Sequence, residues 1–525
     1  MMTADRRPRG RVGRLAAFLS VVLAVSAGGA PPSARGGPVR DVDLARRAGC
    51  DARFVSPLDG AVFPAGFPPP RFQWEVFMIR NLIGLPKSGT GESWTLSVFE
   101  GDRVLHVERN IGEERSWTPT PTQWSGWTGK TLRVELRGKG AYTHTALPLH
   151  LSLDARALPD DVLLRYFVPA PGAKPFVLNS SVDVHLLKID TKTFSRQELF
   201  VGKGSQRRCI GCHTAQTRSG AISFIYTNTA HKPVLRGAFE LTPSSGGWTS
   251  RLLPVAGPYA RYSHAGDKSA FSMFRSTTPG EPLYYQITTP GASSGDVLDY
   301  PAPFDARFVS PSLDVAVYDL KTGALSPLPG ASEPDFVELQ PSWSPDDRRI
   351  AFVRYRDGER MDIAVVPYND GRGGAPKLLA GASANGWDNY YPEYSPDGRW
   401  LAFTRADATG GTFARPDSAV YLVPADGGEA RRLEFNQYGA MNSWHSWSSD
   451  GRWMLFSSKR GGVATKAYVS RIDRDGHASA PVELCCGFAP RSRANMPTWI
   501  KKGDYPRVTE DDVELWEREL SAPKK

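Results

Sequence analysis

Short runs in which apolar and polar residues alternate occupy most of the chain after its first fifty residues. Between residues 51 and 157 they lie at 94–99, 104–107, 131–136 and 147–153, each bounded by turn-forming residues. A period of two over four to eight residues is typical of half-buried strands. Several such strands separated by turns predict a β-sandwich for this part of the chain.

A twelve-residue pattern recurs along the rest of the chain. It runs Pro-Ser-Trp-Ser-Pro-Asp-Asp-Arg-Arg-Ile-Ala-Phe at 341–352 and returns in the same frame at 392–403 and 445–456. Each copy predicts a strand, a tight turn and a second strand, and another predicted hairpin follows each copy. Fainter copies begin at residues 213, 260 and 497. Six units of four antiparallel strands, about fifty residues apart, predict a six-bladed β-propeller.

The last copy is cut short by the end of the chain. We expect residues 182–200, which precede the first copy, to supply its outer strands, because that pairing closes the ring and removes the free sheet edge. The fold class is therefore all-β, with a sandwich in front of a propeller. The expected parts are a signal peptide at 1–30, a linker at 31–50, the sandwich at 51–157, the propeller at 158–503 and a tail with a short helix at 504–525.

The most informative short motif is Cys-Ile-Gly-Cys-His at 209–213. Two thiols three residues apart with an imidazole directly after the second is the spacing for c-type haem attachment. Cys209 and Cys212 would add to the haem vinyl groups, and His213 would bind the iron. Two other interpretations stay open, a Cys209–Cys212 redox disulfide and part of a zinc site, although no second ligand pair has the spacing zinc needs.

The repeat frame suggests where a haem c would lie. His213 is the first residue of its copy, where other copies carry Pro, and His445 holds the same frame position in another copy. We expect the first residue of each copy to lie near one mouth of the central channel. A haem at that mouth would have His213 as its proximal ligand and His445 as a candidate distal ligand, with Met441 and Met496 as alternatives. Two imidazoles would give a low potential, whereas a Met thioether raises it, and the sixth position could also be open.

The N-terminus predicts export. Arginines at positions 6, 7, 9, 11 and 14 precede an apolar run at 15–27 that ends in Val-Ser-Ala, the pattern of a secretory signal peptide cleaved within residues 27–30. The run is too short to span a bilayer comfortably. Removing residues 1–30 lowers the formal net charge from +9 to +5, a balance that requires no nucleic-acid partner. We expect a periplasmic or otherwise exported monomer with no transmembrane segment after signal removal.

Cysteine usage adds one constraint. The chain has 5 Cys, so if two hold haem, then at most one disulfide can form among the other three, Cys50, Cys485 and Cys486.

Three resemblances support this interpretation. The copies of the type Tyr-Ser-Pro-Asp-Gly-Arg-Trp-Leu-Ala-Phe at 394–403 resemble the repeats of TolB-like six-bladed propellers, over roughly residues 176–503. The run Met-Asn-Ser-Trp-His-Ser-Trp-Ser at 441–448, together with the Cys-X-X-Cys-His motif, resembles an exported bacterial group of TolB-like proteins with a c-type haem motif. Residues 56–61 and 72–75 resemble the first strands of fibronectin type III-like domains. The haem motif and the sandwich depart from TolB itself, so no role in the Tol system is implied.

Three function classes are consistent with these features. An electron-transfer or redox-sensing cytochrome requires a six-coordinate iron and a redox partner. A protein-binding scaffold requires a protein partner and uses a haem or disulfide only to stabilise the ring. A haem-dependent peroxidase-type enzyme requires an open sixth position with acid–base groups above it, for which Asn442 and His445 are candidates.

Overall fold

The computed structural model describes residues 50–76, 92–140, 143–169, 182–206, 208–231, 235–254, 260–274, 313–356, 358–407, 415–462, 464–484 and 492–522. The predicted signal peptide, nearly all of the linker, Cys485 and Cys486 lie outside these residues.

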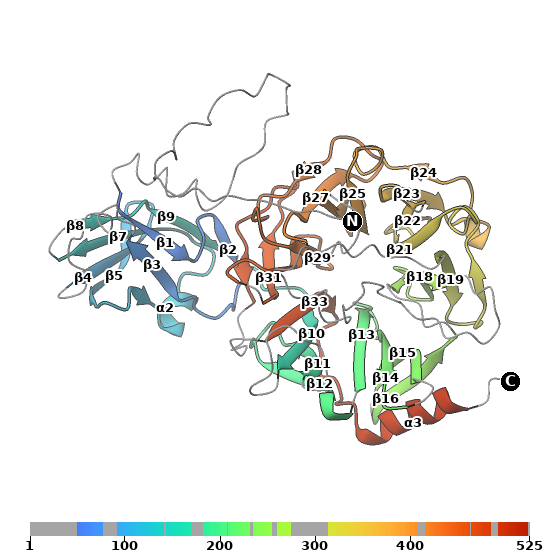
Figure 1. Ribbon diagram of the computed structural model, residues 1–525. Coiled ribbons are helices and arrows are strands. Elements are labelled where there is room, and N and C mark those ends of the chain that lie inside the picture. The colour runs from blue at the N-terminus through green and yellow to red at the C-terminus, as the bar shows by residue number, and fades with distance from the viewer. Residues whose placement is uncertain are drawn as a thin grey trace, which may run out of the picture.

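The described chain is almost entirely β-structure, arranged as a sandwich followed by a ring of sheets (Figure 1). This arrangement confirms the all-β fold class and the six-bladed propeller. No helix in the described ranges is long and apolar enough to cross a membrane.

The sandwich consists of two sheets. One has the strand order β1-β3-β6, and the other has the order β2-β9-β7-β4-β5 with β8 paired to β7. In β4, Trp94, Leu96 and Val98 are buried while the residues between them are partly exposed, which is the alternation that the sequence predicted. The elements are β1 (Ala52–Ser56), β2 (Ala61–Phe63), β3 (Phe72–Val76), β4 (Ser93–Glu100), β5 (Arg103–Ile111), β6 (Ser116–Trp117), α2 (Pro121–Ser125), β7 (Thr131–Lys139), β8 (Thr143–Thr145) and β9 (Leu149–Leu153).

Six four-stranded antiparallel sheets within the described residues form the propeller blades. Blade 1 contains β13 (Arg208–Ala215), β14 (Ile222–Asn228), β15 (Leu235–Ser244) and β16 (Gly247–Leu253). Blade 2 contains β17 (Arg261–Tyr262), β18 (Lys268–Phe274), β19 (Leu313–Asp319) and β20 (Leu325–Pro327). Blade 3 contains β21 (Val337–Trp343), β22 (Arg349–Tyr355), β23 (Asp362–Pro367) and β24 (Lys377–Leu378).

The remaining blades include the one that closes the ring. Blade 4 contains β25 (Asp388–Tyr394), β26 (Trp400–Ala406), β27 (Ala419–Pro424) and β28 (Arg431–Arg432). Blade 5 contains β29 (Asn442–Trp447), β30 (Trp453–Ser458), β31 (Lys466–Arg471) and β32 (Val482–Glu483). The closing blade contains β33 (Arg493–Ile500), β10 (Asp161–Pro169), β11 (Val182–Ile189) and β12 (Arg196–Gly202). Two 3₁₀ turns, η2 (Gly204–Gln206) and η4 (Asn369–Gly371), lie between strands.

The first strand of each blade contacts the first strand of the next, from β33 through β13, β17, β21, β25 and β29 back to β33. These inner strands therefore surround the central axis. Because β33 comes from the end of the chain and β10–β12 come from before the first repeat, the closing blade joins distant segments, as the sequence predicted. The sequence missed β10, which lies between β33 and the predicted outer strands.

The repeated Ser-X-Asp sequence forms the same turn in successive blades. The Ser395 hydroxyl donates to Asp397 (2.6 Å) and accepts from the Trp400 amide (3.0 Å). In blade 5, Ser448 makes the corresponding bonds to Asp450 and Trp453. The side chains thus fix the turn between the first two strands of a blade, which explains why this part of the repeat is the easiest to recognise.

The sandwich packs on the side of the ring, next to blade 5 and the closing blade (Figure 1). One hydrophobic core includes Phe63 of the sandwich together with Trp453 and Trp499 of the propeller. Asp154 accepts from Arg452 (3.3 Å) and Arg471 (3.1 Å) of blade 5. Apolar and ionic contacts therefore hold the two parts together.

The chain ends in α3 (Glu510–Ser521), where the sequence predicted a helix. Its Trp516 is fully buried against the aromatic rings of Phe224 and Phe239 in blade 1. Glu517 accepts hydrogen bonds from Arg208 (3.1 Å) and Asn228 (2.8 Å). The helix therefore anchors the strand that begins one residue before the Cys-X-X-Cys-His motif.

Candidate haem site on strand β13

The motif lies inside the inner strand of blade 1. β13 pairs with β14, and the register shifts between Gly211 and Thr214, which is the mark of a β-bulge. His213 therefore lies inside the strand, near its C-terminal end, and its place at a mouth of the channel stays a prediction. His445 is likewise inside β29 and not at its start.

Cys212 occupies the bulge position that recurs around the ring. Its φ is +50°, a value that is uncommon for a residue with a side chain. The residue directly before the first residue of the repeat has the same left-handed backbone in other blades, at Gln340 (+57°), Tyr391 (+55°), Trp444 (+55°) and Met496 (+54°). The motif thus has the same bulged backbone conformation as the corresponding residues of the other repeat copies.

Cys209 faces the closing blade. Its Sγ accepts a hydrogen bond from Nη2 of Arg165 (2.9 Å), and its side chain packs against Phe167 and Val184. The Arg165 guanidinium lies over the Phe167 ring at 4.4 Å. The closing blade therefore supplies both the polar and the apolar neighbours of this sulfur.

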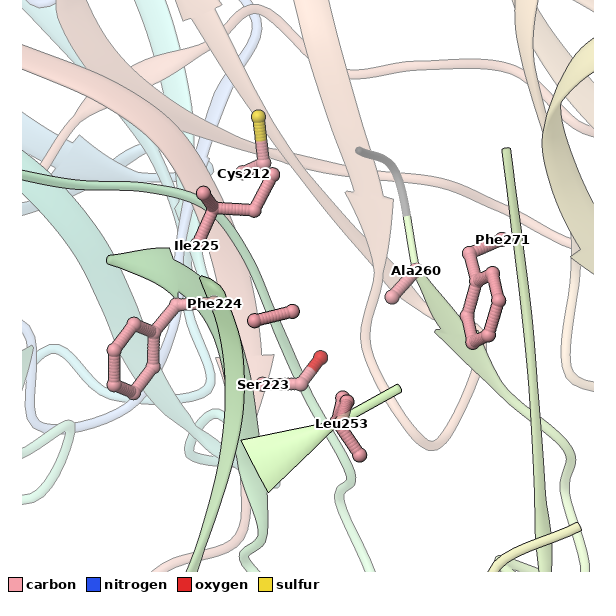
Figure 2. Close-up of a pocket in the computed structure, with 8 residues that line it drawn as sticks. Cys212, Ser223, Phe224, Ile225, Leu253, Ala260 and Phe271 are labelled. Carbon is pink, nitrogen blue, oxygen red and sulfur yellow. The ribbon is translucent and has the colours of Figure 1, made fainter. Parts of the chain in front are cut away.

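Cys212 packs between blades 1 and 2. It contributes to a small pocket of about 10 Å³, which is far below the roughly 300–1,000 Å³ of small-molecule sites. Figure 2 shows Cys212 at one end of this pocket, beside Ile225, with Ala260 and Phe271 on the opposite side. This pocket cannot enclose a porphyrin. No disulfide joins Cys209 to Cys212, so the disulfide alternative is not realised in this structure.

His213 is a buried neutral imidazole. Only 3% of the residue is exposed, and neither ring nitrogen has a hydrogen-bond partner among the described residues. Burial lowers the pKa of His213 to about 3, and the positive charges of Arg165 and Arg261 act in the same direction. The backbone groups of Met496 and Leu163 lie near the ring and oppose this shift in part, although neither meets the geometry of a hydrogen bond. An unprotonated ring nitrogen without a partner is the form of histidine that binds a metal ion.

His445 is also buried, at 4% exposure. Its Nδ1 lies 3.3 Å from the Thr404 hydroxyl, whereas Nε2 has no partner in the described part of the chain. Burial lowers the pKa of His445 to about 4, and the charge of Arg261 adds to that effect. The backbone groups of Ala402 and Tyr391 oppose it.

The other candidate ligands lie in different surroundings. Met496 is at the bulge of β33, and its backbone is next to the His213 ring. Met441 is buried just before β29. Within the described ranges, no three His, Cys, Asp or Glu side chains are gathered as metal ligands. The choice among His445, Met441 and Met496 therefore stays a prediction.

Asn442 does not have the surroundings of an acid–base residue. Its amide nitrogen donates to the backbone oxygens of Ser418, Gln437 and Ala440, and its oxygen accepts from Ser458 and Arg460. The side chain is fully buried and holds the loop that enters blade 5. Its role is structural, which removes one of the two groups named for peroxidase chemistry.

Sequence reasoning missed Arg165 and Arg261, which both act on His213. Arg165 belongs to the unrecognised strand β10, and Arg261 lies in a faint repeat copy. The repeat frame did contain one signal, because Arg261 occupies the same position as Glu393 of blade 4.

The donor set fits a covalently attached haem in its chemistry. Cys209 and Cys212 supply two thiols for the vinyl groups, and His213 supplies a neutral imidazole with unpartnered nitrogens. These three residues would hold the group.

Comparisons with known proteins add little to this description. No family model matches the chain. The "uncharacterized peptidase YuxL" of Bacillus subtilis is 30% identical over 148 residues, which are 27% of this chain and 20% of that protein. The chain therefore spans about a fifth of this relative.

The solved structures with a similar fold have low sequence identity to this chain. TolB from Acinetobacter baumannii has a TM-score of 0.42 at 13% identity, covering 71% of this chain and 80% of that one. Hydrazine synthase of Kuenenia stuttgartiensis has a TM-score of 0.42 at 10% identity, covering 66% of this chain and 48% of that one. A puromycin-hydrolysing peptidase of Mycobacterium tuberculosis has 0.35 at 12% identity, covering 69% and 53%. The propeller follows from the strand pairing of this chain itself.

Proposed function

We propose that this protein is an exported c-type cytochrome on a six-bladed propeller, with electron transfer or redox sensing as its function. The observation that carries the proposal is the place of His213, a buried imidazole directly after two cysteines that form no disulfide with each other. Among the described residues, no group makes a hydrogen bond of good geometry to its ring nitrogens, although the backbone of Met496 and Leu163 lies near. Burying a polar ring without partners costs free energy, so such a site favours a ligand for the ring.

Cys209 and Cys212 would form the thioether bonds, and His213 would bind the iron. The bound haem would supply one-electron exchange. Met441 and Met496 are the proposed candidates for the distal position, because the His445 ring is seated against blade 4 beside Thr404. We expect a periplasmic location because the N-terminal sequence has the pattern of a signal peptide, and we expect a redox partner there.

A second candidate is a protein-binding scaffold. It is favoured by the continuous core between sandwich and ring, which includes Phe63, Trp453 and Trp499, and by the pairing of Asp154 with two arginines of blade 5. Such a body could present loops of both parts to one protein partner. In this case the Cys-X-X-Cys-His motif would serve only the stability of the ring.

Absorption spectra of the full chain, exported together with haem-maturation factors, test the proposal. We expect a Soret band that stays with the polypeptide after denaturation, and its loss in the Cys209→Ser/Cys212→Ser variant. Cys50→Ser is the matched control and should keep the band. Colourless wild-type protein would favour the scaffold, and rapid carbon monoxide binding by the reduced protein would favour an open iron site and an enzyme.

A further inference from the structure

Two arginines near His213 have no carboxylate within ion-pair distance among the described residues. Arg165 directs Nη2 to the Cys209 sulfur (2.9 Å), and its buried Nε has no hydrogen-bond partner in the same part of the chain. The Arg261 side chain donates to the adjacent Ala260 carbonyl oxygen (3.2 Å). Within the described part of the chain, no Asp or Glu side chain forms an ion pair with either guanidinium. Partly buried arginines are normally paired, so this arrangement needs an explanation.

Several charged and polar groups of different blades meet at this place. Arg165 comes from the closing blade and approaches Gly211 of β13, where an added Cβ atom would lie 3.2 Å from Nη1. Arg261 comes from the inner strand of blade 2, and its charge acts on His213 and also on Glu393 of blade 4. Its guanidinium thus faces the space that the inner strands surround.

Glu393 limits what could bind there. Its Oε1 accepts the Trp447 amide (2.9 Å), so one face of this carboxylate is already occupied by blade 5. Two arginines outnumber this one carboxylate, and burial raises the pKa of Glu393, so the place has a net positive charge that suits an anion. A guanidinium binds a carboxylate through two parallel N–H···O bonds, and the unpartnered ring of His213 is an adjacent polar group.

We propose that Arg165 and Arg261 form a binding site for one carboxylate group beside His213, at the inner strand of blade 1. The carboxylate could belong to a haem propionate or to a free organic acid, because the chemistry of recognition is the same. The site does not rest on haem attachment, so it can be tested in a chain that cannot hold haem.

The test uses the full chain with Cys209→Ser/Cys212→Ser, unfolded by heat in sodium propionate or in sodium chloride at equal ionic strength. We expect a saturable rise of the unfolding temperature with propionate only. Arg165→Gln and Arg261→Gln should each weaken the apparent affinity at least tenfold, which corresponds to the loss of a charged hydrogen bond. Arg372→Gln is the matched control, because this exposed arginine pairs with Asp370 in a surface turn.

The proposal would be overturned if propionate did not raise the unfolding temperature more than chloride does. It would also be overturned if the Arg261→Gln variant bound propionate as tightly as the Arg372→Gln variant. Far-UV circular dichroism checks that each variant folds. If Arg165→Gln does not fold, Arg165→Lys keeps the charge and removes only the two-pronged contact, and it should still weaken propionate binding.

Haem-loaded wild-type protein separates the two sources of the carboxylate. If a haem propionate occupies the site, free propionate should no longer raise the unfolding temperature, and Arg261→Gln should lower the reduction potential because a positive charge near the iron is lost. If a free acid is the ligand, the loaded protein should respond like the haem-free one. Failure to attach haem would count against the proposed cytochrome and leave the carboxylate site standing.

Discussion

His213 and His445 sit in equivalent places in two different blades. The His213 ring lies against the backbone of Met496 and Leu163 in the closing blade. The His445 ring lies against the backbone of Tyr391 and Ala402 in blade 4. In each case one backbone group belongs to the bulge residue of the preceding blade, and the other belongs to the strand paired with it. The two imidazoles therefore both point from their own blade toward the preceding blade of the propeller.

This relationship leads to a prediction about the iron. Because the His445 ring is seated against blade 4 and is next to Thr404, we expect it not to be the distal ligand. His445→Gln should leave the absorption spectrum and the reduction potential of the haem-loaded protein unchanged. His213→Gln should abolish the native spectrum. A shift of the spectrum in His445→Gln would show instead that the two imidazoles bind one iron, as the sequence suggested.

The repeat could be recognised in the sequence because side-chain hydrogen bonds stabilise its turns. The bonds of Ser395 and Ser448 to their own Asp residues are local, so they recur as a visible pattern. The strand β10 was missed because Asp161–Pro169 is nearly uniformly apolar and pairs with β33, more than three hundred residues later in the chain. No local pattern encodes such a partner.

The spacing of Cys209, Cys212 and His213 predicts haem attachment, and that chemistry stays a prediction. No local pattern in the sequence indicated the β-bulge on which these residues lie. The left-handed backbone at Cys212 is set by the blade and not by the residue type, since Gln, Tyr, Trp and Met occupy the same position elsewhere. The approach of Arg165 depends on ring closure and has no local signal either.

Glu338 predicts a pH dependence of stability. It is fully buried in β21, accepts the Glu333 amide (2.7 Å) and lies 3.4 Å from Arg354. Burial raises the pKa of Glu338 to about 7. The folded state therefore keeps a proton that the unfolded chain releases near pH 4.5, so stability falls as the pH rises from about 4.5 through 7.

Glu338→Gln should remove this loss. At pH 9 we expect the variant to be more stable than wild type by about 1–3 kcal/mol, and at pH 5 the two should be alike. Arg354 keeps its contact with the Phe336 ring (3.5 Å) in the variant. Urea unfolding at both pH values measures the difference, and Glu359→Gln, at an exposed ion pair, is the control. Equal effects at both pH values would contradict a buried ionisation.

Trp499 tests the closure of the ring. It is 1% exposed, its Nε1 donates to the Ser446 carbonyl oxygen (2.9 Å), and its ring belongs to the core shared with the sandwich. Trp499→Ala should cost about 3–5 kcal/mol, because it leaves a large cavity and an unpaired backbone oxygen. Trp387→Ala, at a 42% exposed site, should cost less than about 0.5 kcal/mol. Guanidinium unfolding followed by circular dichroism compares them, and equal losses would mean that the closing strand contributes little.

Glu517 tests whether α3 holds the strand that carries the motif. Burial alone would raise the pKa of Glu517, but hydrogen bonds from Tyr226, Asn228 and Arg208 outweigh it and lower the pKa. Glu517→Ala removes this acceptor from Tyr226 and Asn228 in a partly buried site and leaves Arg208 only its pair with Glu510, so we expect a loss of about 2–3 kcal/mol. Because Arg208 begins β13, amide hydrogen exchange should quicken in β13 more than in β29 of blade 5. Glu514→Ala changes an exposed carboxylate on the same helix and should leave both readouts unchanged. Equal exchange rates in β13 of the Glu517→Ala and Glu514→Ala variants would mean that only the other strands of blade 1 stabilise β13. The helix would then contribute only the packing of Trp516.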